Sequence, residues 1–159
     1  MDCAQSNRSD AISRTIRHMS ASGQPDWATA TPVSVKASTV ADSISVDRPR
    51  DGLAATRAVL ESGGIAVTVT DDQILAAIPE MASQSGIFPE PAAATPLAAA
   101  KLMVKQGLVA ADEIVVCLVS GNGLKDIARA RTVTTEPLVI DPSLDAVETA
   151  IAGIIKKAS

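Results

Sequence analysis

The chain has 159 residues and a mass of 16.2 kDa, which is enough for one domain rather than two. Hydrophobic residues make up 47% of it and aromatic residues only 1%, so the core has to be built from Ala, Val, Ile and Leu. With one Phe and one Trp, the chain nearly excludes aromatic base stacking as a binding device. The net charge of −4 argues against a basic face for phosphate backbones, so we expect no nucleic-acid partner.

The sequence shows no signal for a membrane or for secretion. The first ten residues are polar, and the most apolar stretch, 91–104, contains Pro96 and is too short to span a bilayer. Cys3 and Cys117 form no paired motif, which is typical of a reducing compartment, and His18 has no pattern of neighbouring metal ligands. We therefore expect a cytoplasmic chain with no metal site and no membrane partner.

The first half of the chain alternates between strand and helix patterns. Cys3 to Gln5 reads as a strand and Ser9 to Met19 as a helix. A loop rich in Ser, Thr, Pro and Gly covers 20–36. Pro49 to Glu61 is predicted to be a helix, because proline is tolerated in the first helical turn, and the β-branched run from Ile65 to Val69 is predicted to be a strand.

The next two elements are predicted to be helices with clear start and stop signals. Thr70 and Gln73 have the spacing of a capping box, and Gly86 is placed to end the helix that they open. A second helix, rich in alanine, is expected from Pro91 to Gln106.

The last third is predicted to contain a buried strand and a final helix. Glu113 to Val119 is a run of Ile, Val, Cys and Leu without alternation, which favours a central strand that is buried on both faces. Asp141 and Pro142 are expected to open a helix that continues through Lys157. This order predicts an α/β fold, an incomplete three-layer αβα arrangement of parallel strands, in a single partial domain over 1–159.

The strongest candidate for a site is the segment Ser120, Gly121, Asn122 and Gly123 at the end of the predicted central strand. Ligands of open α/β sheets bind at the carboxyl ends of strands, and glycines allow a ligand to approach the backbone closely. The alternative is a plain turn between a strand and a helix. A dinucleotide fingerprint fits poorly, because Asp126 stands where the third glycine is needed.

A second candidate is Glu90, which lies between two prolines just before a helix of small residues. Small side chains would let that helix pack closely against a sheet or a cofactor ring. The alternative is a carboxylate that is favoured at this position by the helix dipole alone.

Three blocks of the sequence together resemble the threonine synthase family of pyridoxal phosphate enzymes. They are the segments Thr39–Gly64, Gly86–Leu102 and Val115–Asp126, which occur in the family's order. The resemblance implies the fold type II scaffold, with this chain as the C-terminal part of the large domain. It also implies conversion of O-phosphohomoserine to threonine and phosphate.

The resemblance assigns roles to the candidate residues. Ser120 matches a family hydroxyl that binds the pyridine nitrogen of pyridoxal 5'-phosphate, Gly121, Asn122 and Gly123 match the loop around the ring, and Glu90 matches a glutamate at the pocket's edge. It assigns no catalytic residue to this chain. The family's Schiff-base lysine and its glycine-rich phosphate loop have no counterpart among Lys36, Lys101, Lys105, Lys125, Lys156 and Lys157 or elsewhere.

We therefore expect a threonine synthase-like fragment that is inactive alone and needs a missing N-terminal portion as its partner. Three alternatives stay open. The first is a fragment similar to a serine/threonine dehydratase, and the second is a non-catalytic α/β domain that forms homo-oligomers. The third is a small nucleotide-binding module built on the glycine loop, for which we expect no nucleotide response.

Overall fold

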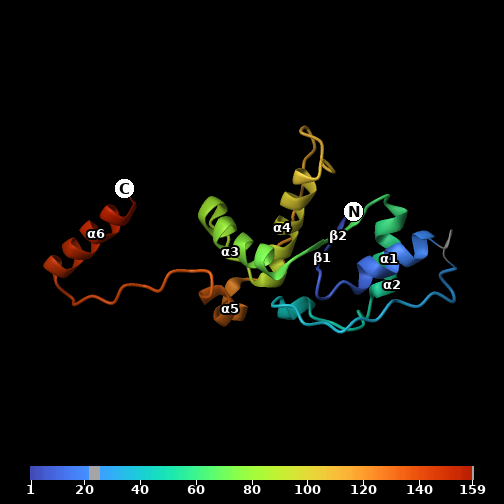
Figure 1. The fold of residues 1–159 in the computed structure, drawn as a ribbon, viewed down its shortest axis with the longest axis horizontal. Coiled ribbons are helices and arrows are strands. Elements are labelled where there is room, and N and C mark those ends of the chain that lie inside the picture. Colours follow the sequence, from blue (N-terminus) through green and yellow to red (C-terminus); the bar gives the residue numbers. More distant parts are fainter. Residues whose placement is uncertain (22–25, 159) are drawn as a thin grey trace.

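The computed structural model describes residues 1–21 and 26–158, and its elements follow one another along an elongated molecule (Figure 1). The strands are β1 (Cys3–Ser6) and β2 (Ala66–Val69). The α-helices of the described residues are α1 (Ala11–Ala21), α2 (Gly52–Glu61), α3 (Asp71–Ser85), α4 (Pro91–Lys105), α5 (Ile127–Arg131) and α6 (Leu144–Ala158). Two short 3-10 helices are η1 (Asp42–Ile44) and η2 (Gly123–Asp126).

The two strands form a parallel pair with helices on both sides. Cys3 pairs with Ala66 and Ser6 pairs with Val69, so the strands end together at one edge. Helix α4 packs against both strands, and α3 packs against α4. Helix α1 contacts the strands from the other side, and α2 packs against α1 (Figure 1). The predicted α/β fold with parallel strands in three layers is therefore confirmed, although the sheet of the described residues has only these two strands.

The core lies between the strands, α3 and α4, and it is built from aliphatic side chains as the composition requires. Val69 of β2 and Ile74 and Ile78 of α3 are fully buried. Helix α4 contributes mainly alanines to this core, including Ala94 and Ala98. Because these side chains end at Cβ, α4 lies close to the strand pair and gives the site described below a rigid floor.

The start and stop signals of α3 and α4 are confirmed. The Thr70 hydroxyl accepts a hydrogen bond from the Gln73 backbone N–H, and the Gln73 side chain accepts one from Thr70 N–H, which completes the capping box. Gly86 ends α3 with φ of 73°, a left-handed conformation that favours glycine. Helix α4 begins at Pro91, as predicted, and ends at Lys105.

Two boundaries in the first half differ from the prediction. Helix α1 continues through Ser20 and Ala21, and the remainder of the expected loop over 20–36 falls partly on residues 22–25, which lie outside the described residues. Helix α2 begins at Gly52 rather than Pro49, because the Pro49 carbonyl accepts the Gly52 N–H in a turn before the helix.

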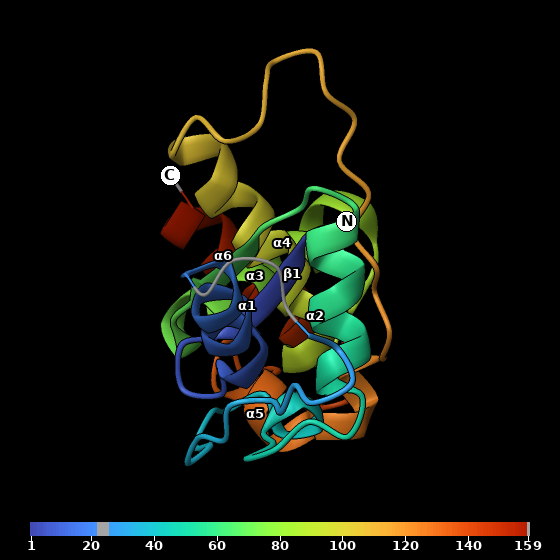
Figure 2. The same ribbon diagram turned by 90° about the vertical axis from the view of Figure 1, so that its right-hand side faces the viewer.

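The predicted central strand over 113–119 is wrong. The segment is extended but unpaired, and Ile114, Val116 and Leu118 are 93%, 88% and 78% exposed. A strand needs a neighbour for its backbone N–H and C=O groups, and the described residues supply none for this segment. Figure 2 shows the stretch after α4 arching clear of the helices and strands before the chain returns to them.

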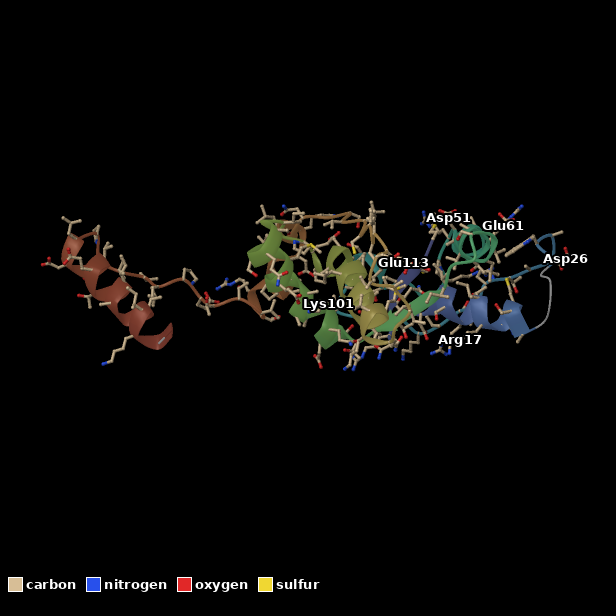
Figure 3. The ribbon with its side chains drawn as sticks, turned by 90° about the horizontal axis from the view of Figure 1, so that it is seen from above. Arg17, Asp26, Asp51, Glu61, Lys101 and Glu113 are labelled. Atoms are coloured by element: carbon tan, nitrogen blue, oxygen red, sulfur yellow. The ribbon has the colours of Figure 1, made fainter. Side chains whose placement is uncertain are left out.

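The final helix is confirmed, but it packs against little. Helix α6 begins at Leu144, where the Ser143 carbonyl and hydroxyl accept N–H groups of the first turn, rather than at Asp141. Its apolar stripe is exposed (Leu144, Val147, Ile151 and Ile154). Figures 1 and 3 show α6 standing apart from the body at the end of an extended linker. None of the helices in the described part of the chain is long and apolar enough to cross a bilayer.

Candidate functional site

The two candidate segments of the sequence meet in the structure. The Glu90 backbone N–H donates to the Gly121 carbonyl at 3.0 Å, and the Gly123 N–H donates to the Phe88 carbonyl at 2.8 Å. Pro89 and Asn122 form an isolated antiparallel bridge between the same segments. The loop over 120–123 is therefore fixed to the start of α4, although the run before it is unpaired.

Glu90 is the buried anchor of this junction, with 4% of its surface exposed. Its Oε2 accepts a hydrogen bond from the Ser43 hydroxyl at 3.1 Å, and its Oε1 lies 3.2 Å from the Lys125 ammonium. Glu90 occupies the N-cap position of α4, but its side chain makes no capping hydrogen bond. The carboxylate thus ties the 3-10 helix η1 to η2, the turn that follows the glycine loop, instead of only complementing the helix dipole.

The two glycines of the loop are required by packing. A Cβ at Gly121 would lie 1.9 Å from Glu90 Oε1, and a Cβ at Gly123 would lie 2.5 Å from the Phe88 ring. Neither distance leaves room for a methyl group. The loop can approach Glu90 and Phe88 only because these two positions carry no side chain.

Ser120 faces an open groove of about 720 Å³. The groove is walled by residues 1–4, which include the first half of β1, and by the unpaired run over 113–118. Its floor includes Ala92 and Pro96 of α4. Ser120 is exposed, so its hydroxyl is open to a ligand. Of the five predicted site residues, Ser120 is the one that lines the groove.

Asn122 has a local structural task. Its Oδ1 accepts the Leu124 N–H at 2.9 Å and so caps the 3-10 helix η2. The structure therefore separates the five predicted residues by what they contact. Ser120 faces the groove, Gly121 and Glu90 contact each other, Gly123 contacts Phe88, and Asn122 caps the following turn.

The groove suits an aromatic ring better than a phosphate. Its polar lining offers the Ser120 hydroxyl, and small side chains of α4 leave a flat floor. The charged side chains of its lining, as far as the structure describes it, are those of the acids Asp2 and Glu113. The N-terminal ammonium belongs to Met1, which also lines the groove, and it donates to the Ser62 hydroxyl. Lys125 is held on Glu90, and Lys101 is paired with Glu80. These residues fit the ring side of a cofactor such as pyridoxal phosphate, but they supply neither a phosphate cradle nor a lysine to anchor it.

The two cysteines face the same groove. Cys3 lies on β1 and Cys117 on the unpaired run, and both are free thiols. Burial raises the pKa of the Cys3 thiol, and it also raises the pKa of the Cys117 thiol. Both thiols are therefore mainly protonated near neutral pH. The strand predicted over 113–119 would have buried Cys117, but that strand does not form and the side chain is only half-buried.

Asp71 joins the carboxyl ends of both strands to the segment before η1, a role that the sequence analysis did not find. Its Oδ1 accepts hydrogen bonds from the hydroxyls of Ser6 at 3.1 Å and Thr39 at 2.5 Å, and its Oδ2 accepts the Val40 N–H at 3.3 Å. Ser43, which reaches Glu90, was missed as well. Ser43 lies in the first of the three resembling blocks and Asp71 lies between the first and the second, but only long-range contacts reveal their partners.

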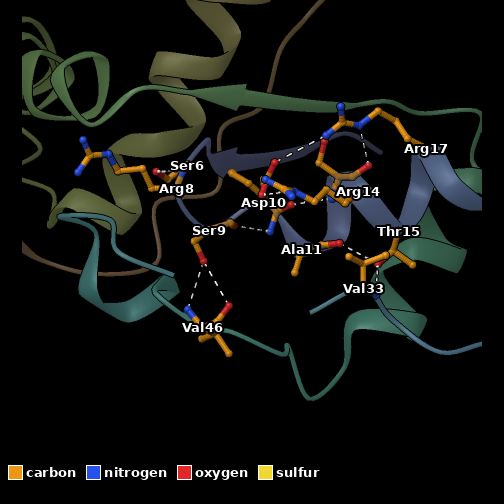
Figure 4. Close-up of polar contacts among 12 residues, drawn as sticks. Ser6, Arg8, Ser9, Asp10, Ala11, Arg14, Thr15, Arg17, Val33 and Val46 are labelled. Atoms are coloured by element: carbon orange, nitrogen blue, oxygen red, sulfur yellow. Dashed lines mark hydrogen bonds and ion pairs between the residues drawn. The ribbon is translucent and has the colours of Figure 1, made fainter. Parts of the chain in front are cut away.

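Ser9, just after β1, holds the segment around η1 by two further hydrogen bonds. Its hydroxyl donates to the Ile44 carbonyl at 2.7 Å. The same hydroxyl accepts the Val46 N–H at 3.2 Å (Figure 4). Thr15 on α1 likewise holds the Val33 N–H at 2.9 Å (Figure 4). The segment over 33–46 is therefore fastened at several points, and it positions Ser43 against Glu90. The described residues contain no group of His, Cys, Asp and Glu that could hold a metal ion.

Comparison with known proteins identifies the class of protein that this fold and groove define. Residues 3–121 match the family described as pyridoxal-phosphate dependent enzyme, and the chain belongs to that family.

Within the family the chain is similar to threonine synthases. It is 42% identical over 118 residues to the threonine synthase of Methanosarcina acetivorans, covering 74% of this chain and 29% of that protein. It is 38% identical over 103 residues to the threonine synthase of Methanocaldococcus jannaschii, covering 65% of this chain and 25% of that protein. The threonine synthase of Halalkalibacterium halodurans is 36% identical over 103 residues. The chain thus spans less than a third of the length of these relatives.

Proposed function

We propose that the chain supplies the ring-side wall of a pyridoxal phosphate pocket in a threonine synthase-like enzyme. The reaction would convert O-phosphohomoserine to threonine and phosphate. The observation that carries this proposal is the loop over 120–123, which is held against the buried Glu90 so that the Ser120 hydroxyl stands exposed on the groove. The similarity to threonine synthases supports the choice of reaction.

Each residue of the junction has a task in this proposal. The Ser120 hydroxyl donates a hydrogen bond to the ring nitrogen, where a carboxylate would instead hold that nitrogen protonated. Gly121 lets the loop lie flat against Glu90, and Glu90 with Ser43 and Lys125 keeps the loop from moving. The cofactor supplies the electron sink for elimination, and the protein tunes it through this hydrogen bond.

The chain alone is not expected to catalyse the reaction. The lysine that anchors the cofactor and the loop that binds its phosphate have no counterpart in the sequence. We infer that a further polypeptide portion completes the pocket, and we place the complex in the cytoplasm. Pyridoxal phosphate added to the chain alone is expected to give no new absorbance band.

A chimera tests the proposal. In it, the residues of this chain replace the matching segment of the Methanosarcina acetivorans threonine synthase, to which they are 42% identical. The chimera is expected to bind pyridoxal phosphate with visible absorbance and to release phosphate from O-phosphohomoserine. A chimera that folds and does neither contradicts the proposal. Release of ammonia from serine or threonine instead would assign the dehydratase alternative.

Variants of the chimera at Ser120 isolate the role of the hydroxyl. Ser120→Ala removes one hydrogen bond of about 0.5–1.5 kcal/mol, so we expect kcat to fall by up to about tenfold. Ser120→Thr keeps the hydroxyl and should retain most of the activity. Equal rates for the two variants would show that the hydroxyl does not act on the ring.

A second candidate function is supported by the exposed apolar surface. The side chains of the run over 113–118 and of the α6 stripe are apolar and largely exposed. Exposed surface of this kind favours association, so the chain can also be a non-catalytic domain that forms homo-oligomers. The two candidates differ in whether the assembled protein binds pyridoxal phosphate.

A further inference from the structure

The groove beside Ser120 has two walls of different origin. One wall is formed by residues 1–4, which include the first half of β1, and the other by the unpaired run over 113–118. The floor is α4, through residues such as Pro96 and Met103. Both walls are extended backbone, and the groove runs between them.

The wall on β1 is an open strand edge. The N–H groups of Cys3 and Asn7 donate to the carbonyls of Ile65 and Val69 on the β2 side. In a parallel ladder, alternate residues point to opposite edges, so Ala4 presents its backbone N–H and C=O away from β2. Within the described residues β1 pairs with β2 alone, which leaves this edge available for a further strand.

The wall opposite is a strand-like run that is held at one end. Its residues Ile114, Val116 and Leu118 are apolar and exposed, a composition that fits the interior of a sheet. Just beyond its end, Gly121 is fixed by the backbone hydrogen bond from Glu90. The run is therefore positioned by the site although it has no partner along its length in the part of the chain that the structure describes.

In Figure 2 the run descends from the arch toward α5 and β1 descends from the N-terminus, so the two point in the same direction. Ser9, just after β1, binds the Ile44 carbonyl, and the neighbouring Ser43 binds Glu90, which binds Gly121. These contacts link the residues just after the run to those just after β1. A strand that filled the groove would thus have two parallel neighbours and would itself run parallel to them, as sheets of one kind prefer.

The size of the groove fits one short strand. A strand residue occupies about 160 Å³ in a packed sheet, from a rise of about 3.3 Å, a strand spacing of about 4.8 Å and a layer spacing of about 10 Å. The groove of about 720 Å³ then holds four to five residues. This matches the four residues of each strand in the existing pair.

We propose that the groove is an acceptor slot for a single extended apolar strand of a partner polypeptide. That strand would lie between β1 and the run over 113–118 and complete a four-stranded parallel sheet. The end of the groove at Ser120, beyond the run, would stay free for the cofactor ring, since ligands of parallel sheets bind past the carboxyl ends of the strands. The partner is the portion of a threonine synthase-like enzyme that this chain does not contain, and this choice rests on the proposed function. The relatives are more than three times as long as the region they share with this chain, so they contain further polypeptide that can supply a strand.

A second copy of the chain is a poorer occupant. Its own run over 113–118 is fixed at Gly121 and already forms a wall. The other extended apolar stretch among the described residues is 138–140, which is three residues long and follows Pro137, a residue that cannot donate to a ladder.

Hydrogen exchange with thiol alkylation tests the slot. The full chain is mixed with the Methanosarcina acetivorans threonine synthase truncated before its matching segment, without cofactor. We expect at least tenfold slower amide exchange at Ala4 and over 114–118, on both walls of the groove. Alkylation of Cys3 and Cys117, one thiol on each wall, should slow in parallel when followed by mass spectrometry.

A matched pair of variants locates the effect. Val116→Lys places a charge in the slot, and because Val116 is exposed the chain alone should fold normally. Val104→Lys places a charge at an exposed position of α4 that does not line the groove. We expect the first variant to lose the protection and the second to keep it. Equal protection in both variants would overturn the proposal.

Two further results would also overturn it. One is unchanged exchange on both walls when the partner portion is added. The other is protection that appears in the chain alone and grows with its concentration, which would assign the slot to a second copy. Because the mixture contains no cofactor, the result is separate from the proposed function. If the chimera is active but the groove gains no protection in the mixture, only the acceptor-slot proposal is contradicted. If the groove is protected but the chimera is inactive, only the proposed function is contradicted.

Discussion

At the scale of single residues, the junction between the glycine loop and α4 depends on the absence of side chains at two positions. Gly121 lies against the carboxylate of Glu90, and Gly123 lies against the ring of Phe88. Sequence reasoning found both glycines and explained them by a ligand. The structure adds a contact inside the protein, so substitutions here are expected to affect folding before they affect binding.

Gly121→Ala is expected to destabilise the chain by about 1–3 kcal/mol, because the new methyl group would overlap Glu90 Oε1 and force the loop or the carboxylate to move. Urea unfolding measures the change. Gly153→Ala is the control, since a Cβ at Gly153 in α6 meets nothing within 4 Å and alanine favours a helix. An unchanged midpoint for Gly121→Ala would mean that the loop is not held where the structure places it.

Asp71→Ala is expected to cost about 1–3 kcal/mol, because it leaves the hydroxyls of Ser6 and Thr39 without their acceptor at the ends of the strands. Asp72→Ala is the matched control. Asp72 is also in the first turn of α3, so both variants lose the same helix-dipole interaction, but its side chain is exposed. Chemical unfolding that gave equal losses would contradict a bridging role for Asp71.

At the scale of elements, local signals predicted the helices well and the strands only in part. The capping box at Thr70 and the glycine at Gly86 fix the ends of α3 within the chain itself, so the sequence was sufficient. The run over 113–119 has the composition of a strand, but a strand is defined by its neighbour. No local pattern could show that the neighbour is missing from the described residues.

The same limit applies to the contacts of the site. The pairing of Glu90 with the glycine loop joins two segments about thirty positions apart, and it could be expected from the sequence only as far as the family resemblance carried it. Two hydrogen bonds could not be expected from the sequence, those from Ser43 to Glu90 and from Thr39 to Asp71. A Ser or Thr in a loop carries no signal that identifies a distant partner.

Helices of similar length should contribute very differently to stability. Ile78 in α3 is fully buried, whereas Ile151 in α6 is 50% exposed. We expect Ile78→Ala to cost about 2–5 kcal/mol through lost burial and the cavity that it leaves. Ile151→Ala should cost less than about 1 kcal/mol, since exposed positions away from such features change stability little. Thermal unfolding of the two variants compares them directly, and a large loss for Ile151→Ala would show that α6 packs on the body.

At the scale of the whole molecule, the chain has a compact centre and apolar parts that extend from it. The centre is made by the strand pair with its four flanking helices (Figure 1). The site lies at the start of α4. The run over 113–118 and α6 expose aliphatic side chains to water. The composition alone required an aliphatic core, but it could not tell how much of that aliphatic surface lacks a partner.

Light scattering of the isolated chain is expected to show dimers or larger species, because exposed aliphatic surface associates. Replacing Ile151 and Ile154 with Glu should reduce the average mass, since both lie on the exposed stripe of α6. A monomer that persists at high concentration in the unmodified chain would argue against the oligomerising alternative.

The linker before α6 has a consequence for the fate of the chain in a cell. Every residue over 134–145 is exposed, and among the described residues α6 begins only at its far end. Proteases cut most readily where backbone is extended and accessible. A single cleavage there would remove the last helix and spare the centre, so the length of the polypeptide recovered from an extract would report whether anything shields this connector.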